Sequence, residues 1–505
     1  MTIDNIHAYA MFMASCFILL LLLNARSHIM KCIAYVQHLV LRYLVYPQLI
    51  QRNRYTGRIN RSEILVPVLL FAANTFCLWF QSPSIHVAGA RAANLSLVNL
   101  IPAFAGPHLS FLADFFGISL FTFRRIHRLA GILSFPLLAF HVAIMMTTQT
   151  PFPLEIAHNM WGLVGAASLS LLLLFSCPIF RRYSYEVFLR IHQALAALIA
   201  FSVWRHLELQ PFLTRLNLYI LAASFLSMLF LQSMHLLYRN KAMGTGLSQA
   251  YIIRDGDAVK IRLRLSRRVR VKAGQYVGLW IPAVSLMSFL QSHPFVVTSW
   301  SEGKQQYLHL LIEPCHGLTQ KLLKSYLAFF SGPHGLSVPV SNYETVLMIA
   351  SGFGIASQLP YLRKLIYDYN ACKSRNRRIR LIWQLETDDE IAILEPLLNA
   401  SLKSDTLDEG YILTISIYIA SGKKYKIPVG RRVDVYYGLA PDLKVIFEEE
   451  RAGKYIKRVQ VETKEQENMA VLVSATFSIR GRARDLMRSY VGEKVVLFEL
   501  EYQPT

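Results

Sequence analysis

The stretches HRLAGILSFPLLAFH (residues 127–141) and HQALAALIAFSVWRH (residues 192–206) decide how this chain folds. Each is apolar, begins and ends with a histidine, and separates its two histidines by 14 positions. In an α-helix, 14 residues rise by about 21 Å and turn to within roughly 40° of the starting direction. Each stretch is therefore predicted to present two imidazoles on one helix face at two depths.

Two such helices side by side would form two levels of facing histidine pairs. Histidine is an axial ligand of haem iron, and ionisable residues inside a membrane usually have a function. The pattern predicts two stacked haems held by four residues: His127, His141, His192 and His206. The alternative is four unrelated histidines at helix ends, and the repeated spacing on two helices favours haem.

The composition indicates a membrane protein with soluble domains. The chain has 505 residues, of which 53% are hydrophobic, and a formal net charge of +21. Many of the basic residues lie between apolar segments, so orientation in a membrane explains them better than nucleic-acid binding does. The six cysteines are scattered and form no CxxC motif, which argues against a disulfide framework and against a metal–thiolate site.

About seven apolar segments are long enough to span a bilayer. They lie at roughly 8–24, 63–81, 95–121, 126–147, 158–178, 186–206 and 213–236. Asp4 rather than basic residues precedes the first segment, so it is predicted to be a spanning helix and not a cleaved signal peptide. Arginine and lysine concentrate in alternate loops. The positive-inside rule then places the N-terminus outside and everything after residue 237 in the cytoplasm.

Topology also predicts how the histidines pair. One full span, 158–178, separates the two histidine helices, so they must run parallel. His127 then lies at the depth of His192 near the cytoplasm, and His141 at the depth of His206 near the outside. An iron with histidine on both sides has no free coordination position, which suits electron transfer.

The second half of the chain alternates strand and helix signals. Short runs such as AVKIRLRL (258–265) and YVGLWI (276–281) predict an antiparallel β-barrel. The stretch TVLMIASGFGIASQLPYLRKL, from residue 345, reads as a buried strand, a turn containing Gly352 and Gly354, and a helix. This order is typical of a doubly wound α/β nucleotide-binding domain.

Four regions follow from these patterns. We predict N-terminal spanning helices with a basic loop (1–92), a haem-bearing bundle (93–240), an antiparallel β-barrel (245–340), to which the family resemblance described below assigns FAD, and a nucleotide-binding α/β domain (341–505). The polar stretch near 400–458 is predicted to be a partly ordered insertion. Its run from Glu448 to Glu450 is predicted to be a solvated face.

Several motifs, taken together in order, resemble the fungal ferric reductase transmembrane components, a family that includes the NADPH oxidases. The matching stretches are HRLAG (127–131), RRYSYEVFLRIH (181–192), HPFVVTSW (293–300), GLTQKL (317–322), SGPHG (331–335) and ASGFGIAS (350–357). The sequence departs from the family at His334, where an aromatic residue is usual, and at Ala356-Ser357, where Thr-Pro is usual. It also has Val473-Ser474-Ala475 in place of Cys-Gly-Pro.

The resemblance implies roles for particular residues. The four histidines would bind two haem b groups, and Gly352 and Gly354 would approach the pyrophosphate of NADPH. FAD would be bound by the following set: His293, Pro294, Phe295, Thr298 and Ser299, with Gly317 and Thr319 near its phosphates and Tyr502 over its ring.

The resemblance also implies an activity. The protein would be an NADPH-dependent ferric-chelate reductase of the plasma membrane, passing electrons across the lipid bilayer to a ferric chelate or cupric ion. An iron permease and oxidase system is the partner that the family suggests, and no nucleic acid is expected. Two alternatives stay open: a superoxide-producing oxidase, and a haem-bearing membrane component whose dehydrogenase part has decayed.

Overall fold

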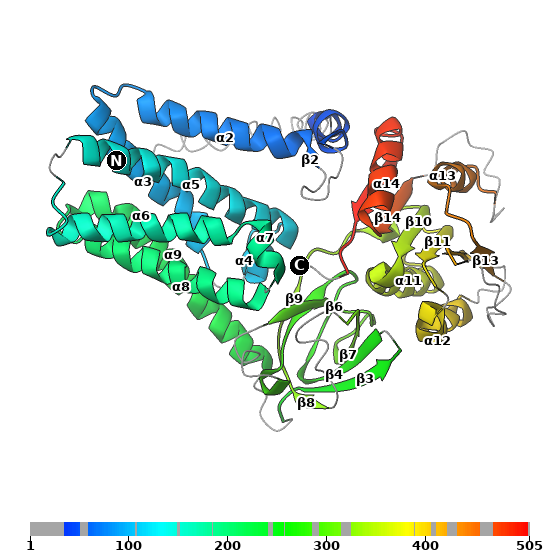
Figure 1. Ribbon diagram of the computed structural model, residues 1–505. Helices are drawn as coiled ribbons and strands as arrows, with labels where there is room; N and C mark the ends of the chain where they lie inside the picture. The colour runs from blue at the N-terminus through cyan, green and yellow to red at the C-terminus, as the bar shows by residue number, and fades with distance from the viewer. Residues whose placement is uncertain are drawn as a thin grey trace, which may run out of the picture.

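The computed structural model describes thirteen stretches of the chain. They are residues 35–50, 59–106, 109–148, 152–183, 185–240, 246–256, 258–284, 292–314, 325–387, 389–405, 411–421, 432–454 and 468–502. The predicted first span, 8–24, and the predicted FAD residues Gly317 and Thr319 lie outside these stretches. Figure 1 shows a helical bundle with a β domain and an α/β domain at one end of it.

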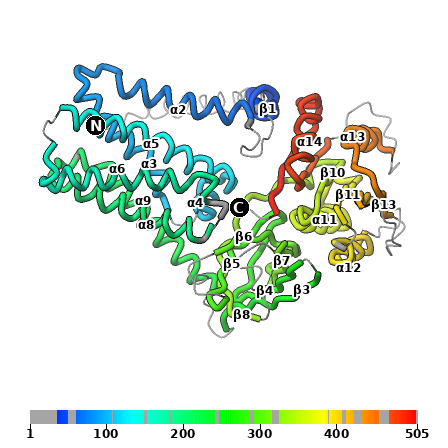
Figure 2. Tube along the Cα trace, in the orientation of Figure 1, coloured from blue at the N-terminus to red at the C-terminus, as the bar shows by residue number. Residues whose placement is uncertain are grey.

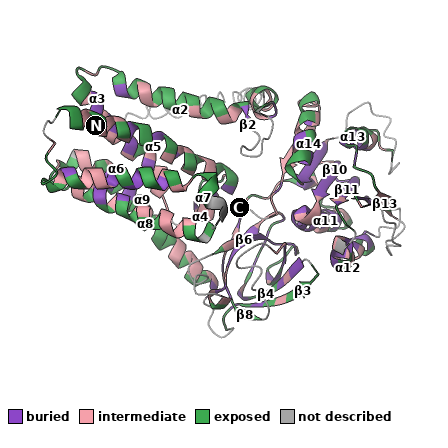
Figure 3. Cartoon of the chain, viewed as in Figure 1, coloured by how far each residue is buried: buried purple, intermediate pink, exposed green. Residues whose placement is uncertain are grey.

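Six helices of the described chain are long and apolar enough to cross a membrane. They are α2 (Arg61–Trp79), α3 (Ile85–Phe104), α5 (Leu120–Thr148), α6 (Ala157–Phe175), α8 (Tyr185–His206) and α9 (Phe212–Asn240). Their outward faces carry exposed apolar side chains, whereas buried residues concentrate in the sheet of the α/β domain (Figure 3). Such an apolar exterior is expected where lipid rather than water surrounds the helices.

The third predicted span, 95–121, is not a single helix. Helix α3 begins earlier, where the Ser84 hydroxyl accepts a hydrogen bond from the Val87 amide, and it ends at Phe104. The short helix α4 (Leu109–Phe115) follows. Hydropathy registers apolar content over a long window, but a side-chain cap determines where the helix starts.

Small polar residues join the helices in pairs. Helix α3 packs on α5, and α6 packs on α8. Between α3 and α5, the hydroxyls of Ser96 and Ser134 each donate to the other residue's carbonyl, at 3.0 and 3.2 Å. Between α6 and α8, a Cβ on Gly165 would lie only 3.3 Å from Ser202 Cβ. Small residues allow this close approach in a membrane. Helix α5 thus packs closely on α3, and α8 on α6, while the histidine rings of α5 and α8 face each other.

The β domain consists of two antiparallel sheets around one core, which confirms the predicted antiparallel β domain. Its strands are β3 (Gln249–Asp255), β4 (Ala258–Val269), β5 (Tyr276–Trp280), β6 (His293–Val296), β7 (Gln305–Ile312), β8 (Tyr326–Leu327) and β9 (Phe329–His334). The sheet orders are β7-β4-β3-β8 and β6-β5-β9, and a single bridge between Val297 and Leu310 joins them. Among the described residues the sheets do not close into a complete barrel.

The α/β domain has a six-stranded parallel sheet of order β13-β12-β11-β10-β14-β15. Its strands are β10 (Thr345–Ser351), β11 (Arg378–Leu385), β12 (Leu413–Ile419), β13 (Val433–Tyr437), β14 (Met469–Ser474) and β15 (Val495–Glu499). Its helices are α11 (Ile355–Asn370), α12 (Asp389–Ser404), α13 (Leu443–Arg451) and α14 (Phe477–Ser489). The strand order reverses between β10 and β14, and ligands of such sheets bind outside the carboxyl ends of the strands at this point.

The predicted insertion near 400–458 is instead part of this sheet, because it supplies β12, β13 and α13. The acidic run is not wholly solvated either. Glu450 is 3% exposed, and its carboxylate lies 3.3 Å from the guanidinium of Arg380, which is 1% exposed. Serine, threonine and tyrosine within β12 dilute its apolar signal, and the partner of Glu450 lies 70 positions away in the chain. Neither feature can be recognised from local composition.

Among the described residues, several contacts join the soluble domains to the N-terminal half of the chain, including the following. Helix α9 ends beside the β domain (Figure 2), and Asn240 at its end exchanges two hydrogen bonds with the backbone of Phe330 in β9. Asp114 of α4 bonds the turn after β9. Tyr46, which directly follows the short helix at Leu41–Val45, is buried against the α/β domain in a core cluster with Val471 and Met487.

Candidate functional site

The predicted histidine pairs face each other across the bundle. The ring centroids of His127 and His192 are 6.0 Å apart, and those of His141 and His206 are 6.4 Å apart. Leu120, at the start of α5, packs on the β domain, so the 127–192 pair is the inner pair, closer to the soluble domains. The two levels are separated by about 21 Å along the helix.

Both pairs fit one metal ion held between two imidazoles. Bonds between a metal and an imidazole nitrogen are about 2.0–2.1 Å long, so rings on opposite sides of one metal have centroids roughly 6–6.5 Å apart. Among the described residues, α5 and α8 make few close backbone contacts with each other, although each packs closely on its own partner helix. The residues present therefore fit haem, whose binding here remains a prediction.

The outer pair has hydrogen bonds that select a ring tautomer. His141 Nδ1 lies 3.0 Å from the Gly89 carbonyl, and His206 Nδ1 lies 2.8 Å from the His158 carbonyl. A carbonyl only accepts, so each Nδ1 carries the proton and each Nε2 keeps a lone pair for a metal. In the inner pair, Nδ1 of His127 and of His192 is buried without a hydrogen-bond partner among the described residues.

His158 is a functional candidate that the sequence patterns missed. Its ring stacks on that of His206, with centroids 4.0 Å apart and planes 16° apart. It lies in neither of the two stretches that begin and end with histidine. One feature of the sequence could have identified it. His158 is the first residue of the predicted span 158–178, and the alternation of spans places the start of that span at the same depth as His206.

The predicted FAD motif forms strand β6 and the residues after it. Phe295 pairs with Val277 of β5. The Thr298 hydroxyl donates to the His309 carbonyl at 2.9 Å, and the His309 amide donates to the Ser299 hydroxyl at 3.1 Å. These two hydroxyls therefore hold the motif against β7, which gives the segment a defined shape before any flavin is considered.

The glycine turn lies at the reversal point of the parallel sheet. Gly352 has φ +48°, a conformation that favours glycine, and its carbonyl accepts from the Trp383 indole at 3.0 Å. A Cβ on Gly354 would lie 2.1 Å from the Ser474 carbonyl oxygen, so only glycine fits at that position. Helix α11 starts directly after the turn, and its free amides suit a pyrophosphate.

Ser474 ends strand β14 beside this turn, within the segment that departs from the family's Cys-Gly-Pro. Its hydroxyl is buried and has no hydrogen-bond partner among the described residues. A buried hydroxyl without a partner is unfavourable. A bound nucleotide would supply one if its polar atoms reached this point.

The chain's C-terminal segment returns to the junction between the domains. The Tyr502 hydroxyl donates to Glu313 at 2.6 Å, directly after β7. Nearby, burial raises the pKa of Glu501 above its usual value, and Arg480 and Arg124 oppose that shift. Burial likewise raises the pKa of Tyr276 in β5. The junction is thus a partly dehydrated region that contains ionisable groups from all three domains.

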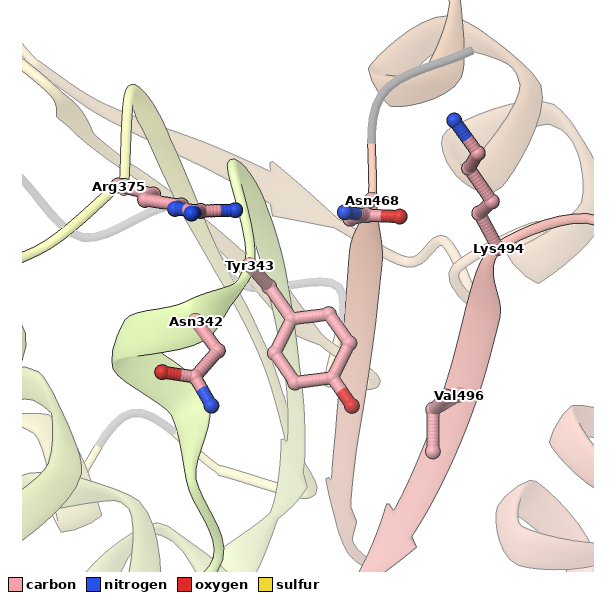
Figure 4. A pocket seen from close by; sticks show the side chains of 6 residues that line it. All are labelled: Asn342, Tyr343, Arg375, Asn468, Lys494 and Val496. Carbon is pink, nitrogen blue, oxygen red and sulfur yellow. The ribbon is translucent and has the colours of Figure 1, made fainter. Parts of the chain in front are cut away.

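A pocket of about 590 Å³ lies at the other end of the parallel sheet, where its strands begin. It is lined by Asn342, Tyr343, Arg375, Asn468, Lys494 and Val496 (Figure 4). These residues lie at or before the amino ends of the strands, whereas nucleotides bind at the carboxyl ends. The pocket is therefore separate from the glycine turn.

An apolar bundle joined to an antiparallel β domain and a doubly wound α/β domain defines a multi-pass membrane oxidoreductase with FAD-binding and NAD(P)-binding domains. Residues 90–203 match the ferric reductase like transmembrane component, residues 245–352 an FAD-binding domain, and residues 343–477 the ferric reductase NAD binding domain. The chain therefore contains a ferric reductase like transmembrane component, an FAD-binding domain and a ferric reductase NAD binding domain, in that order.

Two fungal ferric reductases are similar to this chain. The chain is 28% identical over 286 residues to ferric reductase transmembrane component 3 of Saccharomyces cerevisiae, covering 53% of this chain and 38% of that protein. It is 26% identical over 375 residues to the probable cell surface ferric reductase kap2 of Aspergillus oryzae, covering 66% and 49%. The chain thus spans less than half the length of these relatives.

Among solved structures, a flavohemoglobin from Malassezia yamatoensis with bound FAD and haem aligns at 14% identity. The alignment covers 82% of this chain and 98% of that chain, with a TM-score of 0.39. A TM-score below 0.5 does not establish a shared fold.

Proposed function

We propose that this protein takes electrons from cytoplasmic NADPH and delivers them, through FAD and two haem b groups, to a ferric chelate or cupric ion across the membrane. One of its relatives is named a ferric/cupric reductase. When bound, NADPH supplies a hydride, FAD exchanges two electrons for single electrons, and haem carries one electron at a time. An iron permease and oxidase system is the partner expected to use the reduced iron.

The observation that carries this proposal is the pair of facing imidazoles at each of two levels. The centroid separations of 6.0 and 6.4 Å match one metal between each pair. A single close pair of histidines would be a common packing arrangement. Two pairs on the same two helices, about 21 Å apart along them, are hard to explain without two ligands.

The position of the predicted flavin strand supports the direction of transfer. Val296, the last residue of β6, is buried in a cluster with Tyr276 of β5 and Leu120 of α5. Leu120 precedes His127 by seven residues, which is about 10 Å along the helix. The inner histidine pair is therefore the one that a flavin on β6 would approach.

The chain's own residues perform binding and positioning. The turn of Gly352 and Gly354 would hold the pyrophosphate of NADPH, and β6 would hold FAD. Asp114 and Asn240 fix the β domain against the bundle. The four histidines would hold the irons by Nε2, and the apolar outer faces of the helices exclude water from the transfer region.

Loop charge supports the orientation. The soluble domains follow residue 240, and arginine and lysine concentrate in the loops at that end of the bundle. We propose that the C-terminus is cytoplasmic and that the N-terminus and the outer pair, His141 and His206, face the outside of the plasma membrane.

An optical spectrum of the full-length protein in detergent tests the haem assignment. Replacement of His127 or His192 by leucine should remove the inner haem and leave the outer one, and replacement of His141 or His206 should do the reverse. Retention of both haems in all four variants would overturn the assignment.

The acceptor needs a separate measurement. With NADPH and FAD present, the protein reconstituted in liposomes should reduce an external ferric chelate faster than it consumes oxygen. Oxygen uptake with superoxide formation and no iron reduction would instead identify an oxidase.

A further inference from the structure

His158 and His206 form a reciprocal pair at the outer end of the bundle. His206 Nδ1 lies 2.8 Å from the His158 carbonyl, and His158 Nδ1 is hydrogen-bonded to the His206 carbonyl. The two rings stack with centroids 4.0 Å apart. His158 lies in the first turn of α6 and His206 is the last residue of α8, and they are 48 positions apart in the chain.

The pair constrains the protonation of His206. Both acceptors are carbonyls, so both Nδ1 atoms must carry the proton in these bonds. The Nε2 of neutral His206 is then a lone-pair donor. Since the same ring lies opposite His141, with centroids 6.4 Å apart, the contact to His158 leaves the metal-binding nitrogen free.

The side chain of His158 also satisfies a helix end. His206 is the last residue of α8, and the last four carbonyls of a helix lack partners within it. His158 donates to one of these carbonyls. The side chain therefore holds the backbone of His206 while the backbone of His158 holds the ring of His206.

Gly162 provides an independent indication that α6 is shaped around this ring. A Cβ at position 162 would lie 2.8 Å from His206 Nδ1 and 2.9 Å from its Cε1. Residues 158 and 162 share one helix face because they are four positions apart. One supplies the bonds and the stacked ring, and the other supplies the space in which the His206 ring lies.

We propose that His158 is a positioning residue for the outer iron site. Its side chain bonds the end of α8 and thereby keeps its own carbonyl against His206 Nδ1. This arrangement holds His206 in the orientation and tautomer that present Nε2 to iron, and the bond at Nδ1 makes the ring a stronger electron donor. This inference rests on the proposed function. Partners that orient a metal-binding histidine typically change metal affinity or activity by about 10–100-fold when removed.

The test is an optical redox titration with electron paramagnetic resonance on the full-length protein in nanodiscs. In His158→Ala, outer haem affinity should fall about 10–100-fold. The carbonyl of residue 158 is still present in this variant, but the side-chain bond that keeps it against His206 Nδ1 is lost. The haem that remains should show a raised reduction potential, because a weaker bond at Nδ1 makes His206 a less basic ligand, which stabilises ferric iron less. The inner haem, held by His127 and His192, is the internal control and should keep its potential and spectrum.

Further variants separate positioning from general destabilisation. His158→Asn keeps a donor close to the position of Nδ1 and should restore much of the wild-type signature, whereas His158→Phe keeps only the stacked ring and should not. Gly162→Ala should shift the outer haem without touching His158. Met160→Ala, an exposed change on the same helix, should shift neither haem.

An outer haem with unchanged potential and spectrum in both His158→Ala and Gly162→Ala would overturn the inference. If His158→Ala does not fold, Gly162→Ala and the asparagine variant still decide it. Failure of the underlying function is distinguishable, because His206→Leu would then retain both haems.

Discussion

Asp114 of the membrane bundle binds His334 of the β domain through a short contact between side chains. His334 Nδ1 lies 2.5 Å from Asp114 Oδ2, and the Gly335 amide donates to Oδ1 at 2.8 Å. His334 is 4% exposed, and its Nε2 lies 3.1 Å from the Ser331 hydroxyl. His334 stands where the family usually has an aromatic residue, and it therefore creates a polar link between two domains. The two linked residues are 220 positions apart in the chain.

Strand β9 is held at both ends by the bundle. Asn240, 4% exposed, bonds the Phe330 amide and carbonyl at its start, and Asp114 bonds the turn at its end. Because β9 pairs with β5, and β5 pairs with the flavin-motif strand β6, the two contacts set the distance between that strand and the inner histidines.

Asp114→Ala is expected to slow haem reduction by NADPH, because the β domain loses one of its attachments to the bundle. The expected slowing is roughly tenfold, which corresponds to about 1.4 kcal/mol. The two unpaired donors would cost about 1–3 kcal/mol each if fully buried, and less here because the Asp114 side chain is 31% exposed. Stopped-flow absorbance measures the rate of haem reduction. Reduction of ferricyanide by the flavin does not require the β domain to lie against the bundle, so its rate should not change.

Asp255→Ala is the matched control, since Asp255 pairs with Lys260 on the surface of the same β domain. Equal slowing of both reactions in the Asp114 variant, or equal slowing in the control, would contradict a docking role.

Gly354→Ala is expected to destabilise the α/β domain by about 1–3 kcal/mol, the range for overpacking, and to weaken NADPH binding. The added Cβ would lie 2.1 Å from a backbone oxygen of β14, which cannot move without disturbing the sheet. Thermal unfolding and NADPH titration measure the two effects. Gly303→Ala, whose Cβ would meet nothing within 4 Å, should behave as wild type.

Ser474→Ala is expected to leave the unfolding temperature unchanged or slightly raised, because it deletes a buried hydroxyl without a partner among the described residues. If that hydroxyl meets the nicotinamide nucleotide, kcat/KM for NADPH should fall roughly fivefold, about 1 kcal/mol for one hydrogen bond. Thr414→Val removes another buried hydroxyl without a partner among the described residues, near the amino end of β12 and away from the carboxyl ends where the nucleotide is expected. A fall in kcat/KM of equal size in both variants would argue against a nucleotide contact.

Glu501→Gln is expected to flatten the dependence of stability on pH. Burial raises the pKa of Glu501 above 4.5 in the folded protein. Between the unfolded and folded pKa values, the folded state binds more protons, so stability falls as pH rises through that window. Glutamine does not titrate, so the variant lacks this loss of stability. The difference in unfolding temperature, variant minus wild type, should therefore become more positive as pH rises.

The control for this experiment is Glu448→Gln, an exposed change on α13. A constant difference between Glu501→Gln and wild type across the pH series would mean that burial does not perturb this carboxyl.

Local patterns predicted much of the architecture. The spans at 61–79, 120–148, 157–175, 185–206 and 212–240 lie close to their predicted positions, because apolar length alone defines a spanning helix. The strand–turn–helix at 345–370 followed from a buried strand and two glycines. The start of α3 and the strands β12 and β13 were missed, because a cap and a diluted apolar pattern carry little hydropathy signal.

The sequence by itself determined the order of the three domains, the approximate positions of five spans and, by the 14-residue spacing and the count of spans, which histidines face each other. These properties depend on helix periodicity and chain order, which are local. Only the tertiary structure decided that His158 lies on His206, that Glu450 is buried on Arg380, and that Asp114 holds His334. Such contacts depend on how distant elements pack, and no period in the sequence encodes that packing.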